Sequence, residues 1–544
     1  PLELVVSSIG YRGPQFWKSG DSWKDQWGSN IYHSKDGGQS WVGAFQYYGI
    51  DGGDNPTFEQ MDENGIGWMF NSSIHWSGSV VFDPFNSNKV WVTSGNGVFA
   101  SENVKDYEID DSESWNIKLI QRSKWKVMSH GIEETVPGEV VSIPGGPLVS
   151  VILDYDGFRH NDIAKYPPNR HLTNVGGSNV SLGNTRAIAY APKSGRLVKV
   201  SDSRVHEEQY NDIPISPIQI SNDSGSTWSV DTYPNGLNSS LKGGTSVAIS
   251  ADGEVVLWTP LEGTTEGDQP VQRYANSTWS TVSGIDGSYI VGDPENENVF
   301  YAYNRKTGKM SKSTGKGTAF SEVSSPGASD FQKFRLAPNR EGDIWLPLTN
   351  NGLARSKNGG STFSPISTVS YCEAVGFGKA AEGKTFPTVF IFGTVDGVTG
   401  VFMSTDEGES WIRANDDGHQ YGGLANGEFV VGDMNVYSRV YMSTAGHGIV
   451  YGEITGTTTP VKAAIAATDA IKLKGTELYI NADNRTTHNI RIFDLKGKQV
   501  YNSTVSGSTV LSMNRVLSNG IYVVSVRKGG TVVYSGKVSI LPPQ

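Results

Sequence analysis

The stretch SKDGGQSW at Ser34–Trp41 returns as SNDSGSTW at Ser221–Trp228 and as STDEGESW at Ser404–Trp411. Two weaker copies at Ser356–Phe363 and Ser313–Phe320 keep the serine at the first position and the glycine at the fifth. In the full copies the Asp carboxylate can accept backbone N–H groups and close a turn, and the glycine can adopt a positive φ. Such a turn, repeated between short strands, is typical of β-propeller blades. We therefore expect these Asp residues to be structural and the Trp residues to pack between blades.

The rest of the sequence also favours an all-β fold. Short apolar runs such as Lys89–Thr93 and Val389–Phe392 alternate with Gly, Asn, Asp and Ser, and helical periodicity is almost absent. Glycine makes up 65 of 544 residues, against a typical usage of about 7%. At about 40–50 residues per blade, the region up to Ile454 has room for roughly nine blades. We predict one full and one partial seven-bladed propeller over residues 1–454, a linker over 455–470 and a β-sandwich over 471–544.

Composition excludes several classes of function. The net charge is −11 and the Lys and Arg residues are scattered, so no basic surface is expected to hold nucleic acid. No apolar run approaches the ~20 residues of a membrane span. Cys372 is the single cysteine and is expected to be a small buried residue. The spacing of His and Cys matches no zinc site, so we predict no metal and no cofactor.

The C-terminal region resembles the sorting domains of some bacterial secreted enzymes. The resemblance rests on FDLKGK at Phe493–Lys498 and LSNGIY at Leu517–Tyr522. It implies export across the outer membrane, and thus a secreted or cell-surface protein of a bacterium. An immunoglobulin-like spacer or a sugar-binding module is the alternative interpretation.

The propeller region resembles glycoside hydrolase family 74, the xyloglucanases. The stretches that carry this resemblance are long and follow the family's order: Phe82–Asn88, Gly131–Thr135, Pro147–Asp162, Val375–Ala381, Asn415–Gly422 and Gly446–Gly452. The resemblance implies two propellers with a cleft between them, and inverting endo-hydrolysis of the β-1,4-glucan backbone of xyloglucan, a plant cell-wall polysaccharide. Each propeller of the family supplies one catalytic Asp.

The family's general acid lies in a Gly-Asp-x-Gly-Gly-Phe-Arg-His pattern, which corresponds to Leu153–His160 here. The resemblance therefore implies that Asp154 is the general acid, although Leu153 and Asp156 replace two glycines of the pattern. The stretch with the family's other Asp is not found. Most of the first propeller is expected to be missing, and the missing N-terminal half is a candidate partner.

Inverting hydrolysis needs two carboxyl groups about 6.5–9.5 Å apart. Asp162, Asp416 and Asp417 are the candidates within the chain for the second group. Asp156 either faces the same cleft as Asp154, where its charge would raise the pKa of the acid, or lies in a solvated turn. The alternative function is a non-catalytic glucan-binding propeller that lacks the second carboxylate.

Sugar rings bind to exposed aromatic faces and to polar side chains that hydrogen-bond hydroxyl groups. The Trp-rich segment Trp17–Trp27 and the polar segments Arg159–His160 and His419–Tyr421 have this character. The predicted substrate-binding residues are Trp17, Trp23, Trp27, Trp68, Arg159, His160, His419, Gln420 and Tyr421.

Overall fold

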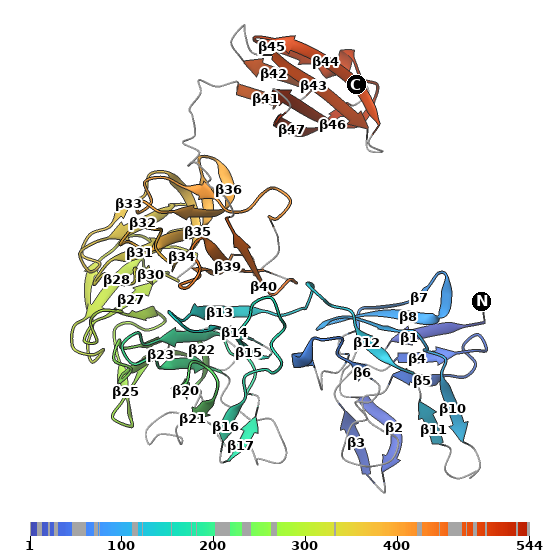
Figure 1. The fold of residues 1–544 in the computed structure, drawn as a ribbon, viewed down its shortest axis with the longest axis horizontal. Helices are drawn as coiled ribbons and strands as arrows, with labels where there is room; N and C mark the ends of the chain where they lie inside the picture. Colours follow the sequence, from blue (N-terminus) through green and yellow to red (C-terminus); the bar gives the residue numbers. More distant parts are fainter. Residues whose placement is uncertain are drawn as a thin grey trace. The chain divides into compact units, whose positions relative to one another are not determined.

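The computed structural model consists almost entirely of short β-strands (Figure 1). It divides into two compact units, Pro1–Pro460 and Val461–Gln544. The structure describes residues 2–7, 13–19, 22–26, 31–45, 61–69, 74, 77–110, 118–121, 123–153, 155–175, 177–180, 182–201, 218–230, 241–262, 269–330, 333–420, 427–444, 446–454, 470–474, 476–481, 487–494, 498–528 and 531–540.

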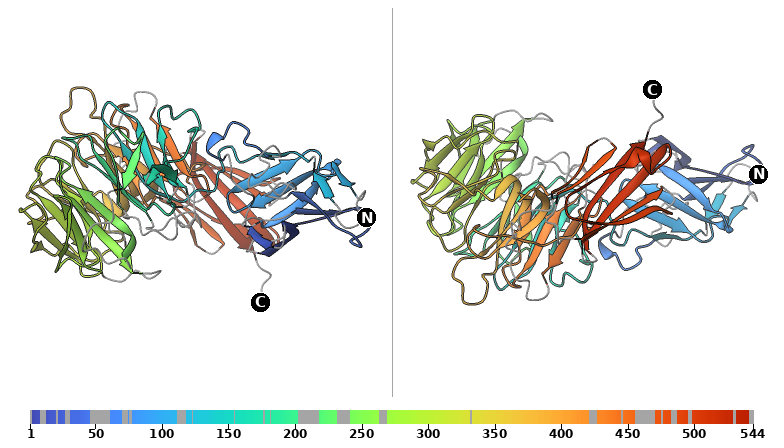
Figure 2. Two further views of the ribbon diagram at one scale, coloured as in Figure 1. Left: turned by 90° about the horizontal axis from the view of Figure 1, so that it is seen from below. Right: turned by 90° about the horizontal axis from the view of Figure 1, so that it is seen from above.

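Seven sheets follow one another between Pro137 and Glu453 in the described residues, as the blades of a β-propeller. Their strands are antiparallel, except that the second sheet is extended by β16 (Thr173–Val175) and β17 (Ser178–Val180), and β16 pairs in parallel with β21. Figure 2 shows several of these small twisted sheets from two further sides. The first blade contains β13 (Pro137–Ser142), β14 (Leu148–Ile152) and β15 (Asp156–His160); the second contains β18 (Ala187–Tyr190), β19 (Leu197–Val200), β20 (Ile218–Ser221) and β21 (Trp228–Val230); and the third contains β22 (Leu241–Ile249), β23 (Val256–Glu262), β24 (Val271–Ala275) and β25 (Thr278–Val282). The fourth blade contains β26 (Tyr289–Gly292), β27 (Phe300–Asn304), β28 (Lys309–Ser313) and β29 (Ser321–Ser324), and the fifth contains β30 (Arg335–Leu336), β31 (Ile344–Pro347), β32 (Leu353–Ser356) and β33 (Ser364–Pro365). The sixth blade contains β34 (Val369–Gly378), β35 (Thr388–Val395), β36 (Val398–Ser404) and β37 (Ile412–Arg413), and the seventh contains β38 (Val430–Gly432), β39 (Arg439–Ser443) and β40 (Ile449–Glu453).

The last blade packs against the first and closes the ring. The Asn435 side chain accepts a hydrogen bond from the Gly145 N–H at 2.6 Å and donates one to the Ile143 carbonyl at 2.9 Å. The Met434 N–H donates to the Ser142 hydroxyl at 2.9 Å. Because these groups lie about 290 positions apart in the chain, they fix the closure directly. The prediction of a full propeller is therefore confirmed.

The repeated turns have the predicted construction. In the copy at Ser221–Trp228, the Asp223 carboxylate accepts the N–H and the hydroxyl of Thr227 at 2.9 and 2.7 Å. Ser221 accepts the Gly225 N–H at 2.9 Å, and Gly225 has a φ of +80°. Trp228 is buried, as is Trp411 in the third copy. The prediction is wrong for Trp41, which is 41% exposed and donates its indole N–H to Gly38 within its own turn.

Four further sheets precede the propeller in the described residues. Two are two-stranded: β2 (Gly13–Ser19) with β3 (Ser22–Gln26), and β10 (Tyr107–Asp110) with β11 (Lys118–Gln121). The other two are larger. They are β1 (Leu4–Ser7), β4 (Ile31–Ser34) and β5 (Val42–Phe45), and then β6 (Met61–Asp62), β12 (Trp125–Val127), β9 (Gly97–Ser101), β8 (Asn86–Ser94) and β7 (Ser79–Asp83). Their buried residues form one hydrophobic cluster with the first propeller blade, in which Trp68, Met69 and Trp125 pack with Ile152 and Phe158. These sheets agree with the predicted partial propeller.

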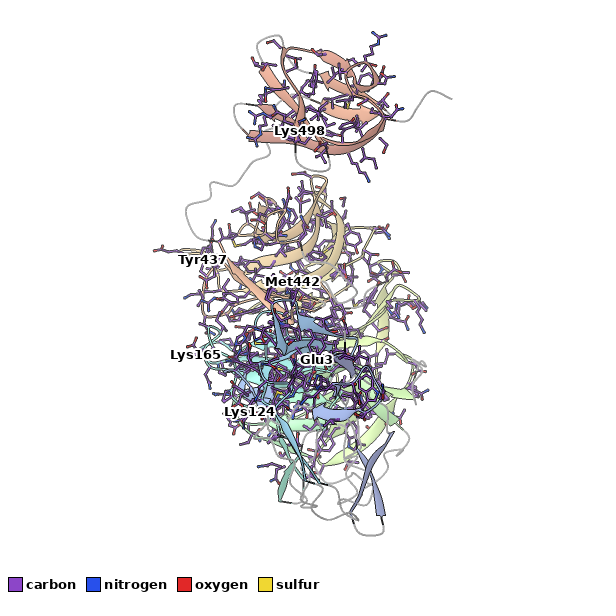
Figure 3. The ribbon with its side chains drawn as sticks, turned by 90° about the vertical axis from the view of Figure 1, so that its right-hand side faces the viewer. Glu3, Lys124, Lys165, Tyr437, Met442 and Lys498 are labelled. Atoms are coloured by element: carbon purple, nitrogen blue, oxygen red, sulfur yellow. The ribbon has the colours of Figure 1, made fainter. Side chains whose placement is uncertain are left out.

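The unit Val461–Gln544 is a two-sheet sandwich. One sheet contains β41 (Ala470–Lys474), β42 (Glu477–Asn481) and β45 (Thr509–Ser512), and the other β44 (Gln499–Ser506), β43 (Thr487–Asp494), β46 (Gly520–Lys528) and β47 (Thr531–Ile540). Residues of both sheets, among them Leu478, Ile490 and Val524, share one core. Lys498, labelled in Figure 3, immediately precedes β44 of this unit. The predicted β-sandwich is thus confirmed, while the predicted linker 455–470 lies almost wholly outside the described residues.

A buried ion cluster joins separate blades of the ring. Glu139 of β13 accepts a hydrogen bond from Arg335 of β30 at 2.5 Å, and Lys333 lies 3.7 Å from the same oxygen. Arg335 also donates to the Tyr289 hydroxyl of β26 at 3.1 Å. Burial disfavours the charge of Glu139, but the two cations outweigh this effect and hold its pKa below the ordinary value. Arg335 of the fifth blade therefore connects Glu139 of the first blade with Tyr289 of the fourth.

Candidate functional site

A cavity of about 460 Å³ lies where the first and last propeller blades meet the preceding chain. Its wall is mostly apolar and aromatic, with a few polar groups, as is common in small-molecule and sugar sites. The lining residues are Trp68, Glu133, Thr135, Leu148, Ile152, Phe158, His160, Ile163, Ala164, Lys165, Tyr166, Pro167, Tyr441, His447, Gly448, Ile449 and Tyr451.

Strand β15 places Phe158 and His160 in this cavity. Residues two apart in a strand share a face, so the two rings stand side by side. Trp68 packs against Phe158, with ring centroids 5.2 Å apart. His160 shares a 2.9 Å hydrogen bond with the Ser150 hydroxyl, and burial lowers the pKa of its imidazole to about 4. At neutral pH this ring is therefore uncharged.

The segment before β13 supplies the acidic group of the cavity. The Gly131 N–H donates to Glu133 at 3.0 Å and to the Tyr166 hydroxyl at 3.2 Å. Burial and the nearby Glu133 raise the pKa of Tyr166 to about 12, so its hydroxyl keeps its proton. His447 donates from Nδ1 to the Gly131 carbonyl at 2.9 Å, which ties the last blade to this segment. Glu133 is the one carboxylate among the described lining residues.

Two of the predicted substrate-binding residues, Trp68 and His160, line the cavity. Arg159 points elsewhere, because its Nε donates to the Ser224 carbonyl in the repeated turn of the next blade at 3.0 Å. Asp154 lies outside the described residues. Its sequence neighbours Ile152 and Phe158 both line the cavity.

The other predicted binding residues are not brought to this cavity among the described residues. Trp17 and Trp23 belong to the hairpin of β2 (Gly13–Ser19) and β3 (Ser22–Gln26), where only the backbone is described. Trp27 and Tyr421 lie outside the described residues. The exposed His419 contacts Asp416, and the half-buried Gln420 donates to the Thr399 carbonyl.

The three candidates for a second carboxylate all serve surface turns. Asp162 accepts the Ala164 N–H at 3.0 Å and pairs with Lys165, which is labelled in Figure 3. Asp416 accepts the Gly418 N–H at 2.9 Å and pairs with the His419 ring. The Asp417 side chain is 91% exposed. None of the three lines the cavity.

Asp156 corrects both interpretations of its role. It is fully buried, so it is not a solvated turn residue, and it does not line the cavity. Its carboxylate accepts the Leu182 N–H at 2.7 Å and the Thr185 hydroxyl at 2.8 Å. Lys199, also buried, lies 3.8 Å away.

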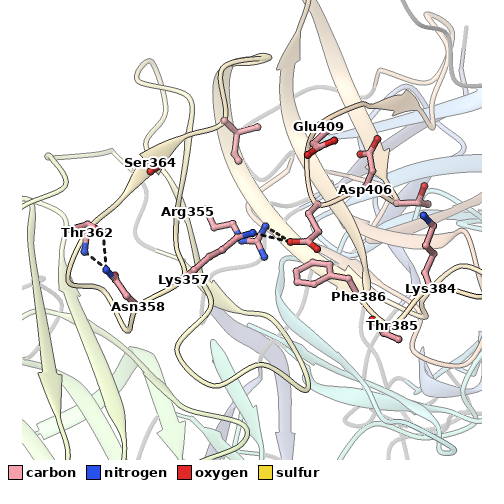
Figure 4. Close-up of a pocket in the computed structure, with 13 residues that line it drawn as sticks. Arg355, Lys357, Asn358, Thr362, Ser364, Lys384, Thr385, Phe386, Asp406 and Glu409 are labelled. Carbon is pink, nitrogen blue, oxygen red and sulfur yellow. Dashed lines mark hydrogen bonds and ion pairs between the residues drawn. The ribbon is translucent and has the colours of Figure 1, made fainter.

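A second cavity, of about 630 Å³, lies between the repeated turns of the fifth and sixth blades (Figure 4). Three of its charged groups pair with one another: Arg355 and Lys357 both contact Glu407, at 2.8 and 3.1 Å. Arg355 also binds Asp343 at 2.5 Å. Because these charges satisfy each other, the cavity is better explained as part of the contact between blades.

No group of three or more His, Cys, Asp or Glu residues able to hold a metal ion is present in the described part of the chain. Within the same residues, no helix is long and apolar enough to cross a membrane.

Comparison with known proteins identifies relatives of both units. Residues 474–540 match the model of the secretion system C-terminal sorting domain. A xyloglucanase of Acetivibrio thermocellus is 32% identical over 454 residues, which cover 79% of this chain and 48% of that protein. The solved GH74 enzyme of Niastella koreensis superposes with a TM-score of 0.65 at 33% identity and covers 84% of this chain and 59% of its own.

The chain is related to glycoside hydrolase family 74. It spans about half the length of the curated relatives it matches; a Paenibacillus xyloglucanase, 27% identical, is matched over 90% of this chain and 46% of its own length. A GH74 xyloglucanase of Xanthomonas campestris also superposes, with a TM-score of 0.64 at 26% identity, covering 84% of this chain and 57% of that one.

Sequence reasoning missed Glu133 and Tyr166 as residues of the candidate site. Glu133 lies in Gly131–Thr135, one of the stretches that carry the family resemblance, so a signal was present. Tyr166 follows the Pro147–Asp162 stretch and only the fold brings it to Glu133.

Proposed function

We propose that this chain hydrolyses the β-1,4-glucan backbone of xyloglucan within the polymer and with inversion. Two things support the proposal: the relatedness to proteins named xyloglucanases, and the aromatic cavity beside the sequence that matches the family's acid pattern. The observation that carries it is that Ile152 and Phe158, on either side of Asp154 in the sequence, both line this cavity.

In this mechanism Asp154 protonates the glycosidic oxygen as the bond breaks, and a second carboxylate accepts a proton from the attacking water. Trp68 and Phe158 are only 4% and 5% exposed, so they form the apolar floor of the cavity and not an open stacking face. The Tyr166 hydroxyl and the neutral His160 ring provide hydrogen bonds to sugar hydroxyls without adding charge. Arg159, by contrast, holds the neighbouring blade.

Reducing-end release from purified xyloglucan tests this proposal. Asp154→Asn should lower turnover by at least about 10³-fold while binding in affinity electrophoresis persists. The exposed Glu382 lies in a turn of another blade, so Glu382→Gln is a matched control that should retain full turnover. NMR of the first product should show the inverted anomer. Unchanged turnover of Asp154→Asn would refute the assignment of the acid.

The second carboxylate is sought with single amide variants of Glu133, Asp162, Asp416 and Asp417. The base should control the acidic limb of the profile of kcat/KM against pH, so its amide variant should lose that limb together with turnover.

A non-catalytic glucan-binding propeller is the second candidate function. The observation that favours it is that the described lining of the cavity contains one carboxylate, Glu133, whereas inverting hydrolysis needs two. This function predicts retention on xyloglucan without new reducing ends, both for the chain alone and after addition of the N-terminal half of a family 74 enzyme.

We further propose that the C-terminal sandwich directs export of the chain to the bacterial surface or medium. The match of residues 474–540 to the sorting-domain model supports this proposal. Removing residues 461–544 should leave the protein inside cells of a host that carries the corresponding secretion system. Unchanged export of the truncated protein would contradict it.

A further inference from the structure

Asp156 occupies a backbone position at which a side chain is unusual. It begins β15 with a φ of +61°, a conformation that glycine adopts far more readily than Asp. Its side chain is nevertheless fully buried and accepts hydrogen bonds from Leu182 and Thr185, 26 and 29 positions further along the chain. The carboxylate therefore has a function that a glycine could not supply.

The charge beside this carboxylate is also buried. Lys199 of β19 is fully enclosed, with its Nζ 3.8 Å from the Asp156 carboxylate and 4.7 Å from the centre of the Trp228 ring. Among the described residues Nζ has no hydrogen-bond partner. A buried ammonium group is costly unless an opposite charge lies nearby, so Lys199 and Asp156 depend on each other.

The other groups around the pair do not replace either charge. Burial and the nearby Lys199 lower the pKa of His171 well below its ordinary value, which keeps that ring neutral. The Thr185 hydroxyl lies 2.7 Å from Ser201, which in turn lies 2.7 Å from the Gln219 side chain. The Asp156 carboxylate is thus anchored to the second blade through neutral hydrogen bonds and one cation.

This anchor lies at one end of the hairpin turn between β14 and β15. At the other end, the Leu153 N–H donates to the Val136 carbonyl at 3.0 Å. Both ends of the turn are therefore held by groups outside the hairpin. A misplacement of about 1 Å of a catalytic group can cost about 100-fold in rate, so the anchors of such a turn affect catalysis.

We propose that Asp156 and Lys199 are positioning residues on which proton transfer by Asp154 depends. This inference rests on the proposed function. If they position the acid, their loss should matter most when the leaving group needs protonation. Xyloglucan, whose leaving group is a sugar alkoxide, needs this proton; a dinitrophenyl glycoside of a xyloglucan oligosaccharide, whose leaving group is a stable phenolate, hardly does.

The test compares kcat for these two substrates in Asp156→Asn, Lys199→Met and the double variant. Each single variant should lower kcat on xyloglucan by about 10- to 100-fold with little change in KM, and should lower kcat on the aryl glycoside by less than about threefold. The double variant removes both charges and should regain thermal stability without regaining kcat on xyloglucan. Glu297→Gln, which breaks the exposed pair with Lys193, is the control and should change neither substrate.

Equal losses on both substrates, or recovery of kcat together with stability in the double variant, would overturn the inference and leave Asp156 a purely structural residue. Full activity of Asp154→Asn would instead refute the acid assignment itself. Inactivity of the native chain on both substrates would refute the proposed function and this inference with it.

Discussion

Replacing Glu139 by Gln should destabilise the propeller strongly, because it leaves two cations without their buried counter-ion. Arg335 donates to this carboxylate at 2.5 Å and Lys333 lies at 3.7 Å, while Glu139 itself is 4% exposed. Breaking a buried pair by removing one partner typically costs about 3–5 kcal/mol. For the unit Pro1–Pro460, at an unfolding entropy of about 2.1 cal/mol/K per residue, the loss corresponds to a fall in Tm of about 3–5 °C.

Tryptophan fluorescence is a suitable assay, because all 14 Trp residues lie in Pro1–Pro460 and none lies in the sandwich. Glu322→Gln is the matched control. Its pair with Lys309 has a similar length, 2.9 Å, but both side chains are about half exposed, so its loss should cost less than about 1 kcal/mol. Similar small shifts in Tm for the two variants would refute the reasoning.

The pH dependence of this effect has a defined sign. The pKa of Glu139 is lower in the folded than in the unfolded chain. Its contribution to stability is therefore complete above the unfolded pKa, near 4.5, and is lost as the pH falls through the folded value. The difference in Tm between the native chain and Glu139→Gln should be largest at neutral pH and shrink at strongly acidic pH.

Replacing Gly157 by Ala should prevent the native hairpin from forming, since a Cβ would lie 2.0 Å from the Ser150 carbonyl oxygen at a φ of +133°; soluble yield and circular dichroism would show this, and a normally folded variant would contradict it. Asp406→Ala removes the acceptor of the Ser410 N–H and should cost about 1–2 kcal/mol in urea denaturation, whereas an unchanged midpoint would argue against the turn's importance. His160 has its pKa lowered to about 4, so the folded chain resists the proton that the unfolded chain binds. Stability should fall by up to about 3 kcal/mol as the pH drops from about 6.5 to 4, and His160→Gln should lose less.

The sequence was most informative where structure is local. The repeated turns could be predicted because Asp223, Gly225 and Thr227 form their bonds within a few positions of one another. Trp41 could not be placed correctly from the same motif, because the burial of an indole depends on the sheet beside it and not on its own turn. The sandwich followed from strand alternation and turn spacing, which are again local properties.

The candidate site was less predictable because distant residues build it. The repeat indicated blades but not which side chains meet. Glu133 and Tyr166 come together because the first blade brings the segments before β13 and after β15 side by side, and His447 joins them through the closure of the ring. Asp156 illustrates the limit: its neighbours in the sequence suggested either a cleft or a solvated turn. Its actual partners, Leu182, Thr185 and Lys199, lie 26 to 43 positions away in the next blade.

Glu139 and Asp156 are both buried carboxylates of the first blade, and this makes each the control for the other. Glu139 pairs in register with Val151 on β14, and Asp156 pairs with Ile152 on the same strand. A general loosening of the blade would affect both in the same way. If Glu139→Gln lowers stability but leaves the ratio of rates on xyloglucan and the aryl glycoside unchanged, while Asp156→Asn changes that ratio, the effect of Asp156 is specific to the turn that follows Ile152. If both variants change the ratio equally, proton transfer depends on the rigidity of the whole blade and not on the Asp156–Lys199 pair.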